Sequence, residues 1–164
     1  MKQRLREAAL DSHPVYQLLT RWLERHPALR TIATFAALPG EIDLSSLTAS
    51  HPEIHWAFPR VSGETLVFHR VKNQAELLPG AFHILEPSPT LPETEISAID
   101  AFICPGLAFD ARGGRLGRGK GFYDRILKNA RADAQKIGVC HALQRVPDVF
   151  SEAHDIRMDQ IISG

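Results

Sequence analysis

Residues 99–127 read IDAFICPGLAFDARGGRLGRGKGFYDRIL, and this stretch changes character several times. It begins with an apolar run typical of a buried strand, turns at Pro105-Gly106, and passes through a glycine-rich loop into a helical pattern. Between residues 114 and 121 the loop combines four glycines with three cations. Glycine lets main-chain amides approach an anion, and the helix that follows adds its positive N-terminal end. The loop therefore predicts an anion site, and its cations favour a polyphosphate.

Three established motifs resemble parts of this loop, and none fits it completely. Gly114 to Lys120 spells GxxxxGK, but a P-loop continues with a Ser or Thr that binds magnesium, whereas Gly121 follows here. A dinucleotide-binding fingerprint that began at Gly117 would need a glycine in place of Phe122. An RGG-type RNA-binding segment would be repetitive and disordered, whereas this loop leads into a patterned helix. A flexible, solvated loop would leave three cations among four glycines unexplained, so polyphosphate binding is preferred.

A nucleotide in this loop would also need a ligand for its magnesium ion. Magnesium bound to a nucleotide usually takes one or two protein carboxylates, and phosphate oxygens and waters complete its coordination. Asp124, at the start of the helical pattern, is the nearest carboxylate, and a second could come from residues 154–159, which read HDIRMD. On the residues alone, Asp124 is equally consistent with a helix cap and with a metal ligand.

The rest of the chain predicts an α/β fold with a largely parallel central sheet flanked by helices. Apolar runs at 31–38, 55–61, 65–71, 101–104, 136–140 and 160–162 are typical of strands covered on both faces. The spacing of apolar residues from Val15 to Leu23, after a Ser12 or Asp11 cap and before Pro27, predicts an amphipathic helix. Shorter helical patterns cover 43–47 and 123–130. A turn is expected at Ser62-Gly63, and the Pro-rich stretch 84–93 is expected to be a surface excursion.

Composition and charge limit the kinds of protein that this chain can be. The 164 residues fit one domain, 1–164, and 19 basic residues balance 19 acidic ones, so any anion site must be local. The N-terminus is charged from the second residue and has no apolar run, which predicts no signal peptide or membrane span and a cytoplasmic location. Cys104 and Cys140 lie in apolar contexts without CxxC spacing, which predicts reduced core residues with no metal or redox role.

Several motifs together resemble the 5-formyltetrahydrofolate cyclo-ligase family, also called methenyltetrahydrofolate synthetases. They are KQRLR at 2–6, PGEID at 39–43, PGAFHILEP at 79–87, PGLAFDARGGRLGRGKGFYDR at 105–125 and HDIRMDQII at 154–162. The resemblance covers nearly the whole chain and implies a three-layer fold like that of NagB, RpiA and CoA transferases. It also implies a magnesium- and ATP-dependent conversion of 5-formyltetrahydrofolate to 5,10-methenyltetrahydrofolate, which releases ADP and phosphate.

The resemblance implies a role for individual residues. The ATP-binding residues would be Lys2, Arg6, Arg115, Leu116, Gly117, Arg118, Gly119, Lys120, Gly121, Phe122 and Tyr123. The folate-binding residues would be Arg6, Glu41, Arg118, Gly119, Lys120, Gly121 and Phe122. Asp124 and Asp155 would bind Mg²⁺, and Arg118 and Lys120 would be the catalytic cations. Two features depart from the family: the stretch between Arg6 and the first strand is short, and Phe122 stands where a tyrosine is common.

Some alternatives stay open at this level. Glu41 suits the donor edge of a 2-amino-4-oxo pterin ring, but on the residues alone it is equally consistent with a turn or helix-cap acid. Lys2 and Arg6 belong to a terminus of the kind that is commonly solvated, so their roles depend on the resemblance. An enzyme that works as a monomer on ATP and 5-formyltetrahydrofolate, with no nucleic acid or membrane partner, is the leading hypothesis. The alternative is a non-catalytic folate- or nucleotide-binding paralogue.

Overall fold

A seven-stranded sheet in the order β11-β10-β7-β1-β2-β3-β6 forms the centre of the fold. The structure is a computed structural model that describes residues 1, 3, 5 and 10–164. The strands from β11 to β2 run parallel to one another, and β3 and β6 are antiparallel additions at one edge. Their bounds are β1 Thr31–Ala33, β2 His55–Ser62, β3 Thr65–Arg70, β6 Glu93–Thr94, β7 Ala101–Cys104, β10 Gln135–Cys140 and β11 Gln160–Ser163. The predicted largely parallel sheet is confirmed.

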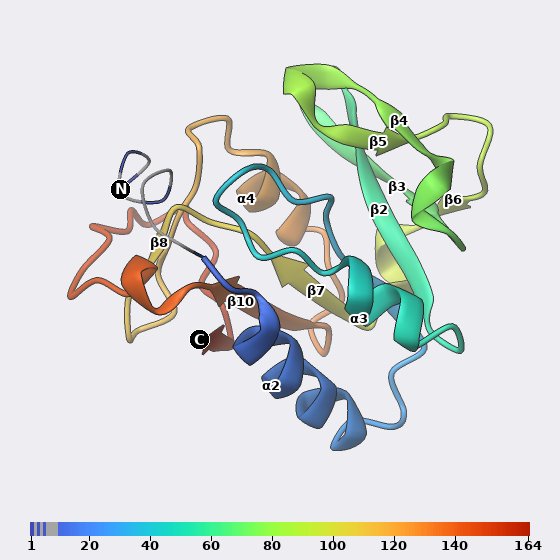
Figure 1. Ribbon diagram of the computed structural model, residues 1–164. Helices are drawn as coiled ribbons and strands as arrows, with labels where there is room; N and C mark the ends of the chain where they lie inside the picture. Colours follow the sequence, from blue (N-terminus) through green and yellow to red (C-terminus); the bar gives the residue numbers. More distant parts are fainter. Residues whose placement is uncertain (2, 4, 6–9) are drawn as a thin grey trace.

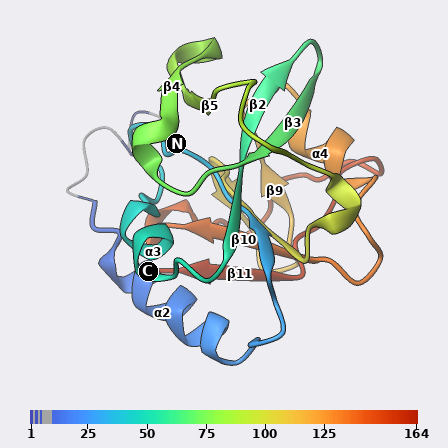
Figure 2. The same ribbon diagram turned by 90° about the vertical axis from the view of Figure 1, so that its right-hand side faces the viewer.

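Helices cover both faces of this sheet, which gives the predicted three layers (Figure 2). On one face, α2 (His13–Glu24) and α3 (Ser45–Ser50) bury apolar residues against the sheet, and on the other face α4 (Phe122–Leu127) does so. The two core clusters contain different side chains of the same strands, such as Ile103 and Phe102 of β7. Among the described residues, no helix is long and apolar enough to cross a membrane.

The sequence of α2 explains both its ends and its buried face. Its apolar residues recur at helical spacing, and Val15, Leu19, Trp22 and Leu23 are all buried. Pro14 lies in the first turn, where a missing amide costs no helical hydrogen bond. Ser12 is the N-cap residue, but its side chain accepts a hydrogen bond from the Asp43 amide rather than capping the helix. This bond ties the start of α2 to the segment before α3.

Shorter elements connect the main strands. Two small hairpins pair β4 (Leu77–Pro79) with β5 (Leu85–Pro87) and β8 (Ala108–Phe109) with β9 (Arg115–Leu116). Single turns of 3₁₀ helix lie at Gln74–Glu76, Ala81–His83, Ile96–Ala98 and Ala142–Gln144. In Figure 1 the β4–β5 hairpin projects at one end of the molecule, next to β2 and β3.

The helical patterns expected at 43–47 and 123–130 form α3 at Ser45–Ser50 and α4 at Phe122–Leu127, and three other segments also differ from the prediction. The first strand ends at Ala33, and residues 34–38 are irregular. The turn between β2 and β3 falls on Gly63 and Glu64, one residue later than expected. The stretch 84–93 is more than a surface excursion, because it contains β5 and the first residue of β6, and Glu86 is buried. A carboxylate oxygen of Glu86 accepts a hydrogen bond from the Val61 amide of β2, which fixes the hairpin to the sheet.

The two cysteines are buried, free thiols, as the sequence predicts. Burial raises the pKa of the Cys104 thiol to about 12 and that of Cys140 to about 11. Only the thiolate is a strong nucleophile, so both thiols are kept in their unreactive, protonated form at neutral pH.

The order of the strands places a switch point between β1 and β7. From β1 the chain continues to β2 on one side, whereas from β7 it continues to β10 and β11 on the other. In open α/β sheets, the loops that follow the carboxyl ends of two such strands enclose a crevice. Here those loops are residues 34–44 after β1 and residues 105–121 after β7. The fold therefore brings Glu41 and the glycine loop to one edge of the sheet.

Gly113 offers a direct test of how the β8–β9 hairpin is packed. Its φ is +83°, and a Cβ at this position would collide with the main-chain oxygen of Met158. We expect Gly113→Ala to lower the free energy of unfolding by about 3 kcal/mol, because a strained backbone and an overpacked contact add together.

Gly63→Ala is the matched control, because Gly63 also has a positive φ, +60°, but a Cβ there would meet only open space. It should cost about 1–2 kcal/mol. Urea denaturation measures both variants, and equal losses would show that the contact with Met158 is unimportant.

Candidate functional site at the carboxyl edge of the sheet

One carboxylate shapes the tip of the β8–β9 hairpin. Asp110 Oδ1 accepts hydrogen bonds of 2.9 Å from the amides of Arg112 and Gly114, and Oδ2 accepts one of 3.2 Å from the Val149 amide. The Asp110 side chain is almost fully buried, at 2% exposed. It therefore joins the hairpin that leads into the glycine loop to the segment that precedes Asp155.

The hydrogen bonds also determine the charge state of Asp110. Burial alone would raise the pKa of its carboxyl, but the amides of Gly114, Val149 and Arg112 stabilise the ionised form, and the net effect lowers the pKa. Asp110 is ionised at neutral pH and acts as an internal anchor. Because all three amides point at its oxygens, it is a structural residue rather than a candidate catalyst.

The glycine loop itself presents free main-chain donors. Gly119 and Gly121 have φ values of +88° and +66°, a left-handed conformation that glycine adopts at little cost. Within the described part of the chain, the amides of residues 117–121 donate no hydrogen bond to another protein group. Successive amides that are left free in such a conformation form a concave anion-binding nest. The free amides and the two left-handed glycines of this loop are the features that such a nest requires.

Arg115 and Asp124 form a partly buried ion pair beneath the loop. Arg115 Nη2 lies 3.3 Å from Asp124 Oδ2, and Arg115 Nη1 donates to the carbonyl oxygen of Pro105. The Arg115 side chain is only 5% exposed, and its guanidinium lies 5.3 Å from the centre of the Tyr123 ring. Its Nε is buried and has no hydrogen-bond partner in the described structure. One donor of this guanidinium is therefore still available.

Arg118 and Glu41 join the two loops of the switch point. Arg118 Nε and Nη2 both donate to Glu41 Oε1, at 3.0 and 2.9 Å. The other oxygen, Oε2, accepts the Leu38 amide across a turn in which Gly40 has a φ of +88°. Because the Glu41 side chain is only 8% exposed, this ion pair is shielded from water on the Glu41 side. Two residues predicted to bind folate are thus in direct contact.

Cations and aromatic rings alternate in a row of contacts beside the glycine loop. Lys120 Nζ lies 5.0 Å from the centre of the Phe82 ring, and the Phe82 and Phe122 rings are 6.3 Å apart. On the far side of Phe122, the Arg125 guanidinium lies 5.4 Å from the ring. Phe82 is a half-exposed residue of the β4–β5 hairpin, with a φ of +57°. Sequence reasoning missed Phe82, because it noted the PGAFHILEP motif but assigned no role to its aromatic residue.

The two predicted metal ligands, Asp124 and Asp155, belong to segments that are joined by a hydrogen bond. Asp124 Oδ1 accepts a hydrogen bond of 3.2 Å from the Ile156 amide, so its carboxylate lies beside the residue after Asp155. Asp155 Oδ2 accepts the Glu152 amide at 2.7 Å. No group of three or more His, Cys, Asp or Glu residues suited to a metal is found among the described residues. The two carboxylates alone suit an ion that brings its own oxygen ligands, as nucleotide-bound magnesium does.

The remaining predicted residues fall into two groups. The first group is Leu116 and Tyr123. Leu116, in β9, is 44% exposed. Burial raises the pKa of the Tyr123 phenol, so the phenol stays protonated and its ring serves for packing. Lys2 and Arg6 lie outside the described residues. Glu41 and the glycine loop follow the carboxyl ends of β1 and β7, whereas Asp124 lies in the first turn of α4 and Asp155 lies in the segment before β11 whose Ile156 amide binds Asp124.

The Asp110 anchor predicts how stability depends on pH. Because the pKa of Asp110 is lowered by folding, its contribution is present above its unfolded pKa, about 3.9, and is lost as the pH falls through the folded value. We expect Asp110→Asn to lower the free energy of unfolding by about 1–3 kcal/mol at pH 7, since one main-chain donor loses its acceptor. Urea denaturation at pH 7 and at pH 3 should show the difference from wild type shrinking in acid.

Asp133→Asn is the control, because Asp133 is highly exposed and its one ion pair among the described residues is with Arg131 at the surface. It should change stability by less than about 1 kcal/mol. An Asp110→Asn deficit that is the same at both pH values would contradict the assigned ionisation.

The chain is similar to known proteins in sequence and in fold. The sequence model of the 5-formyltetrahydrofolate cyclo-ligase family matches residues 16–164. The 5-formyltetrahydrofolate cyclo-ligase of Escherichia coli strain K12 is 31% identical over 159 residues, which cover 90% of this chain and 86% of the relative. The enzyme of the same name from Mycolicibacterium smegmatis is 40% identical over 88 residues, and this match spans 53% of the chain and 45% of that enzyme.

A solved structure supports the fold as well. The NMR structure of Aquifex aeolicus 5,10-methenyltetrahydrofolate synthetase superposes with a TM-score of 0.80 and 33% identity, over 93% of this chain and 77% of that one. Since the family model covers most of the chain, and the E. coli relative matches it almost from end to end, this chain belongs to the 5-formyltetrahydrofolate cyclo-ligase family.

Proposed function

We propose that this chain, acting as one domain over residues 1–164, closes 5-formyltetrahydrofolate to 5,10-methenyltetrahydrofolate at the expense of ATP. The observation that carries the proposal is the contact between Arg118 of the glycine loop and Glu41 of the opposite loop. A residue expected at the phosphates and a residue expected at the pterin meet at the switch point of the sheet. Two reactants that bind to these loops would therefore lie next to each other.

The reaction requires an enzyme that neutralises charge. A formamide is a poor electrophile, so ATP would first transfer its γ-phosphoryl group to the formyl oxygen, and ADP would leave. Nitrogen 10 of the folate then attacks the activated formyl carbon and gives up its proton to solvent, phosphate departs with the former formyl oxygen, and the methenyl bridge is formed. Phosphoryl transfer depends mainly on positioning and electrostatic stabilisation. The loop offers free amides and cations for this task, without a covalent nucleophile.

The nucleotide phosphates would lie on the nest of residues 117–121, with Arg118 and Lys120 as the catalytic cations. Both cations are exposed at the loop, and Lys120 forms no ion pair in the described part of the chain. Arg115 would support the phosphates from below through its unused Nε. The remaining loop residues between Leu116 and Tyr123 would shape this surface. Lys2 and Arg6, which lie outside the described residues, would close over the nucleotide by analogy with the family.

Asp124 and Asp155 would hold magnesium at the edge of the phosphate site. Their fit rests on the donor chemistry and on the Asp124–Ile156 hydrogen bond, which brings Asp124 beside the segment that carries Asp155. When bound, magnesium would neutralise phosphate oxygens during the transfer. Asp124 would then exchange its contact with Arg115 for the metal, which frees the Arg115 guanidinium for a phosphate oxygen.

The folate would bind on the other side of the loop. Glu41 is buried except at the crevice, and its carboxylate would accept hydrogen bonds from the 2-amino and ring N–H donors of the pterin. The Phe82 and Phe122 rings lie beside the loop and offer apolar faces to the folate. Binding of the pterin to Glu41 requires that Arg118 release this carboxylate. A phosphate that binds Arg118 and a pterin that binds Glu41 therefore both break the same ion pair.

A direct assay tests the proposal. Purified protein mixed with ATP, magnesium and 5-formyltetrahydrofolate should show rising near-ultraviolet absorbance of the methenyl product, together with release of ADP. Folded protein that binds 5-formyltetrahydrofolate tightly but releases no ADP would instead indicate a non-catalytic paralogue. Multiple turnovers would exclude that alternative.

Lys120 provides a prediction about catalysis. Lys120→Ala should lower turnover by about a hundredfold, or about 3 kcal/mol, because a cation that stabilises the transferring phosphoryl group is removed. Steady-state kinetics measure the effect. Lys128→Ala is the matched control, because Lys128 is an exposed lysine at the C-terminal end of α4, and it should turn over like wild type. Equal rates for the two variants would contradict the role of Lys120.

The Arg118–Glu41 ion pair predicts that the two substrates assist each other. A nucleotide phosphate that attracts Arg118 frees Glu41 for the pterin, so 5-formyltetrahydrofolate should bind at least about fivefold more tightly with a non-hydrolysable magnesium–ATP analogue present. Titration calorimetry measures both orders of addition, and linkage requires the same factor in each. Identical affinities with and without the analogue would show that this ion pair does not couple the two ligands.

A further inference from the structure

The far end of the glycine loop is held by an arginine for which the sequence suggests no role. Arg125, in α4, donates from Nη2 to the carbonyl oxygen of Lys120 at 2.7 Å and from Nε to that of Glu64 at 2.8 Å. Glu64 lies in the turn between β2 and β3. One guanidinium therefore joins the glycine loop, the helix that follows it and a hairpin of the central sheet.

The surroundings of Arg125 hold its guanidinium in place and leave its charge uncompensated. The guanidinium lies 5.4 Å from the centre of the Phe122 ring, a contact that favours a cation. Among the residues that the structure describes, Arg125 forms no ion pair, whereas Arg115 and Arg118 are both paired with carboxylates. Arg125 therefore keeps its two carbonyl partners and its positive charge when an anion enters the loop.

The carbonyl of Lys120 belongs to the same peptide group as the amide of Gly121. A peptide group is planar, and each one in the described residues is trans, so its C=O and N–H bonds point in opposite directions. Because Arg125 fixes the carbonyl oxygen on one side, the Gly121 N–H is fixed on the other. This amide donates no hydrogen bond to another described protein group. The donor is thus oriented and left free for a ligand.

Arg125 also makes this amide a stronger donor. A cation at the carbonyl oxygen polarises the peptide group, and hydrogen bonds that are linked through one group reinforce each other. An anion at the Gly121 N–H would complete a chain of guanidinium, peptide group and anion. The charge of Arg125 would then favour the anion through a single peptide group, without direct contact.

The glycine at position 121 makes room for this arrangement. Gly121 has a φ of +66°, and a Cβ there would lie only 2.9 Å from Arg125 Nη1. Gly119 has a φ of +88°, but a Cβ at that position would meet open space. Backbone conformation alone accounts for the glycine at 119, whereas the glycine at 121 is also required for the approach of the guanidinium.

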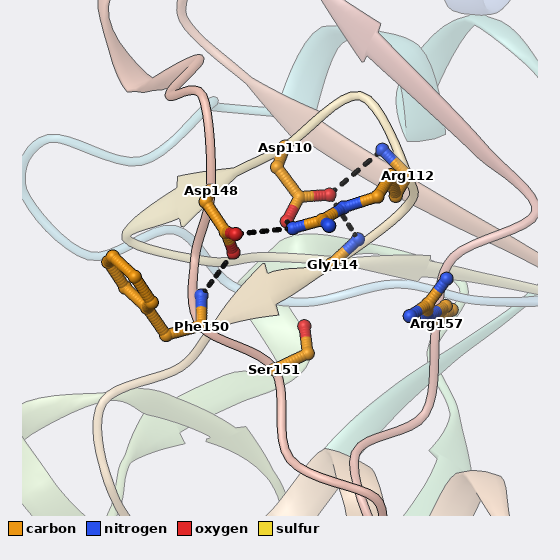
Figure 3. Close-up of a pocket in the computed structure, with 7 residues that line it drawn as sticks. All are labelled: Asp110, Arg112, Gly114, Asp148, Phe150, Ser151 and Arg157. Carbon is orange, nitrogen blue, oxygen red and sulfur yellow. Dashed lines mark hydrogen bonds and ion pairs between the residues drawn. The ribbon is translucent and has the colours of Figure 1, made fainter.

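The start of the loop is supported in the opposite way. At the hairpin tip, the Asp110 carboxylate accepts hydrogen bonds from the amides of Arg112 and Gly114 (Figure 3). An acceptor at the start of the loop occupies main-chain donors, whereas Arg125 at the far end occupies carbonyls and leaves the amides unused. The two supports together favour an anion at the end of the loop that is nearer to Arg125.

We propose that Arg125 is a positioning residue of the phosphate site, which bridges the carbonyls of Lys120 and Glu64 and thereby directs a polarised Gly121 amide at a phosphate oxygen. This inference rests on the proposed function, because it assumes that the nucleotide phosphates lie on residues 117–121. Both the charge and the bridge are required. Lysine would supply the charge alone, since a single ammonium group lacks the planar fork of a guanidinium.

Titration calorimetry with magnesium tripolyphosphate measures the phosphate site without a nucleoside. Arg125→Ala should bind about tenfold more weakly than wild type, because a charge-assisted hydrogen bond that orients a ligand donor is lost. Arg125→Lys should remain at least about threefold weaker than wild type, because it cannot bridge both carbonyls. Arg21→Ala is the matched control, since it removes an exposed arginine from α2, and it should bind like wild type.

Amide NMR spectra distinguish the orientation of one donor from general support of the loop. In wild type, magnesium tripolyphosphate should shift the amide signals of both Gly119 and Gly121. In Arg125→Ala at saturating ligand, the shift of Gly121 should fall by at least about half, because its peptide group is no longer polarised, whereas that of Gly119 should persist. Loss of both shifts would show that Arg125 only supports the loop, and would overturn the inference.

Three other results would also overturn it. They are an Arg125→Ala variant that keeps both the affinity and the Gly121 shift, an Arg125→Lys variant that binds like wild type, and a wild type that binds no tripolyphosphate. Product formation judges the proposed function separately. If wild type forms the methenyl product and Arg125→Ala binds tripolyphosphate normally, the reaction stands and only the role of Arg125 is lost.

Discussion

The parallel pairing of β1 with β7 is the constraint on which the site depends. Ile32 pairs with Ala101, and Ala33 with Phe102, so two strands far apart in the chain end side by side. The loop after β1 carries Glu41, and the loop after β7 carries the glycines and cations. Without this pairing, the residues proposed for the pterin and for the phosphates would have no common edge. Core packing on both faces of the sheet holds the strands in this register.

The second requirement is a firm support for a loop rich in glycine. Asp110 meets it by accepting three main-chain amides, two from the hairpin tip and one from the segment that leads to Asp155. The close packing of Gly113 against Met158 also holds the hairpin tip to the segment before β11. The part of the loop beyond this support is residues 117–121, whose amides donate no hydrogen bond to another described group. The β8–β9 hairpin and the loop of residues 117–121 are therefore adjacent parts of one continuous segment.

The sequence was sufficient for the frame of the fold, because buried parallel strands are continuous apolar runs and α2 has strong helical spacing. The family was also recognisable, and the match to its model confirms it. The prediction of a surface excursion at 84–93 missed β5, since a three-residue strand with prolines has no periodicity, and missed the burial of Glu86, which depends on a distant partner, Val61. Phe82 could not be singled out, because its left-handed backbone and exposure arise from tertiary structure. The ion pairs of Arg115 and Arg118 likewise depend on contacts between separate segments.

The two arginines of the glycine loop already have carboxylate partners in the protein, Asp124 and Glu41. An uncomplexed anion such as sulfate that recruited either arginine would have to strip it from its carboxylate, and would leave that carboxylate without a counter-charge. A ligand that arrives as a salt with its own divalent cation exchanges partners instead, since the cation compensates the carboxylate that is set free. If the nucleotide binds as proposed, these two arginines would favour a magnesium–nucleotide complex over a simple anion by charge balance.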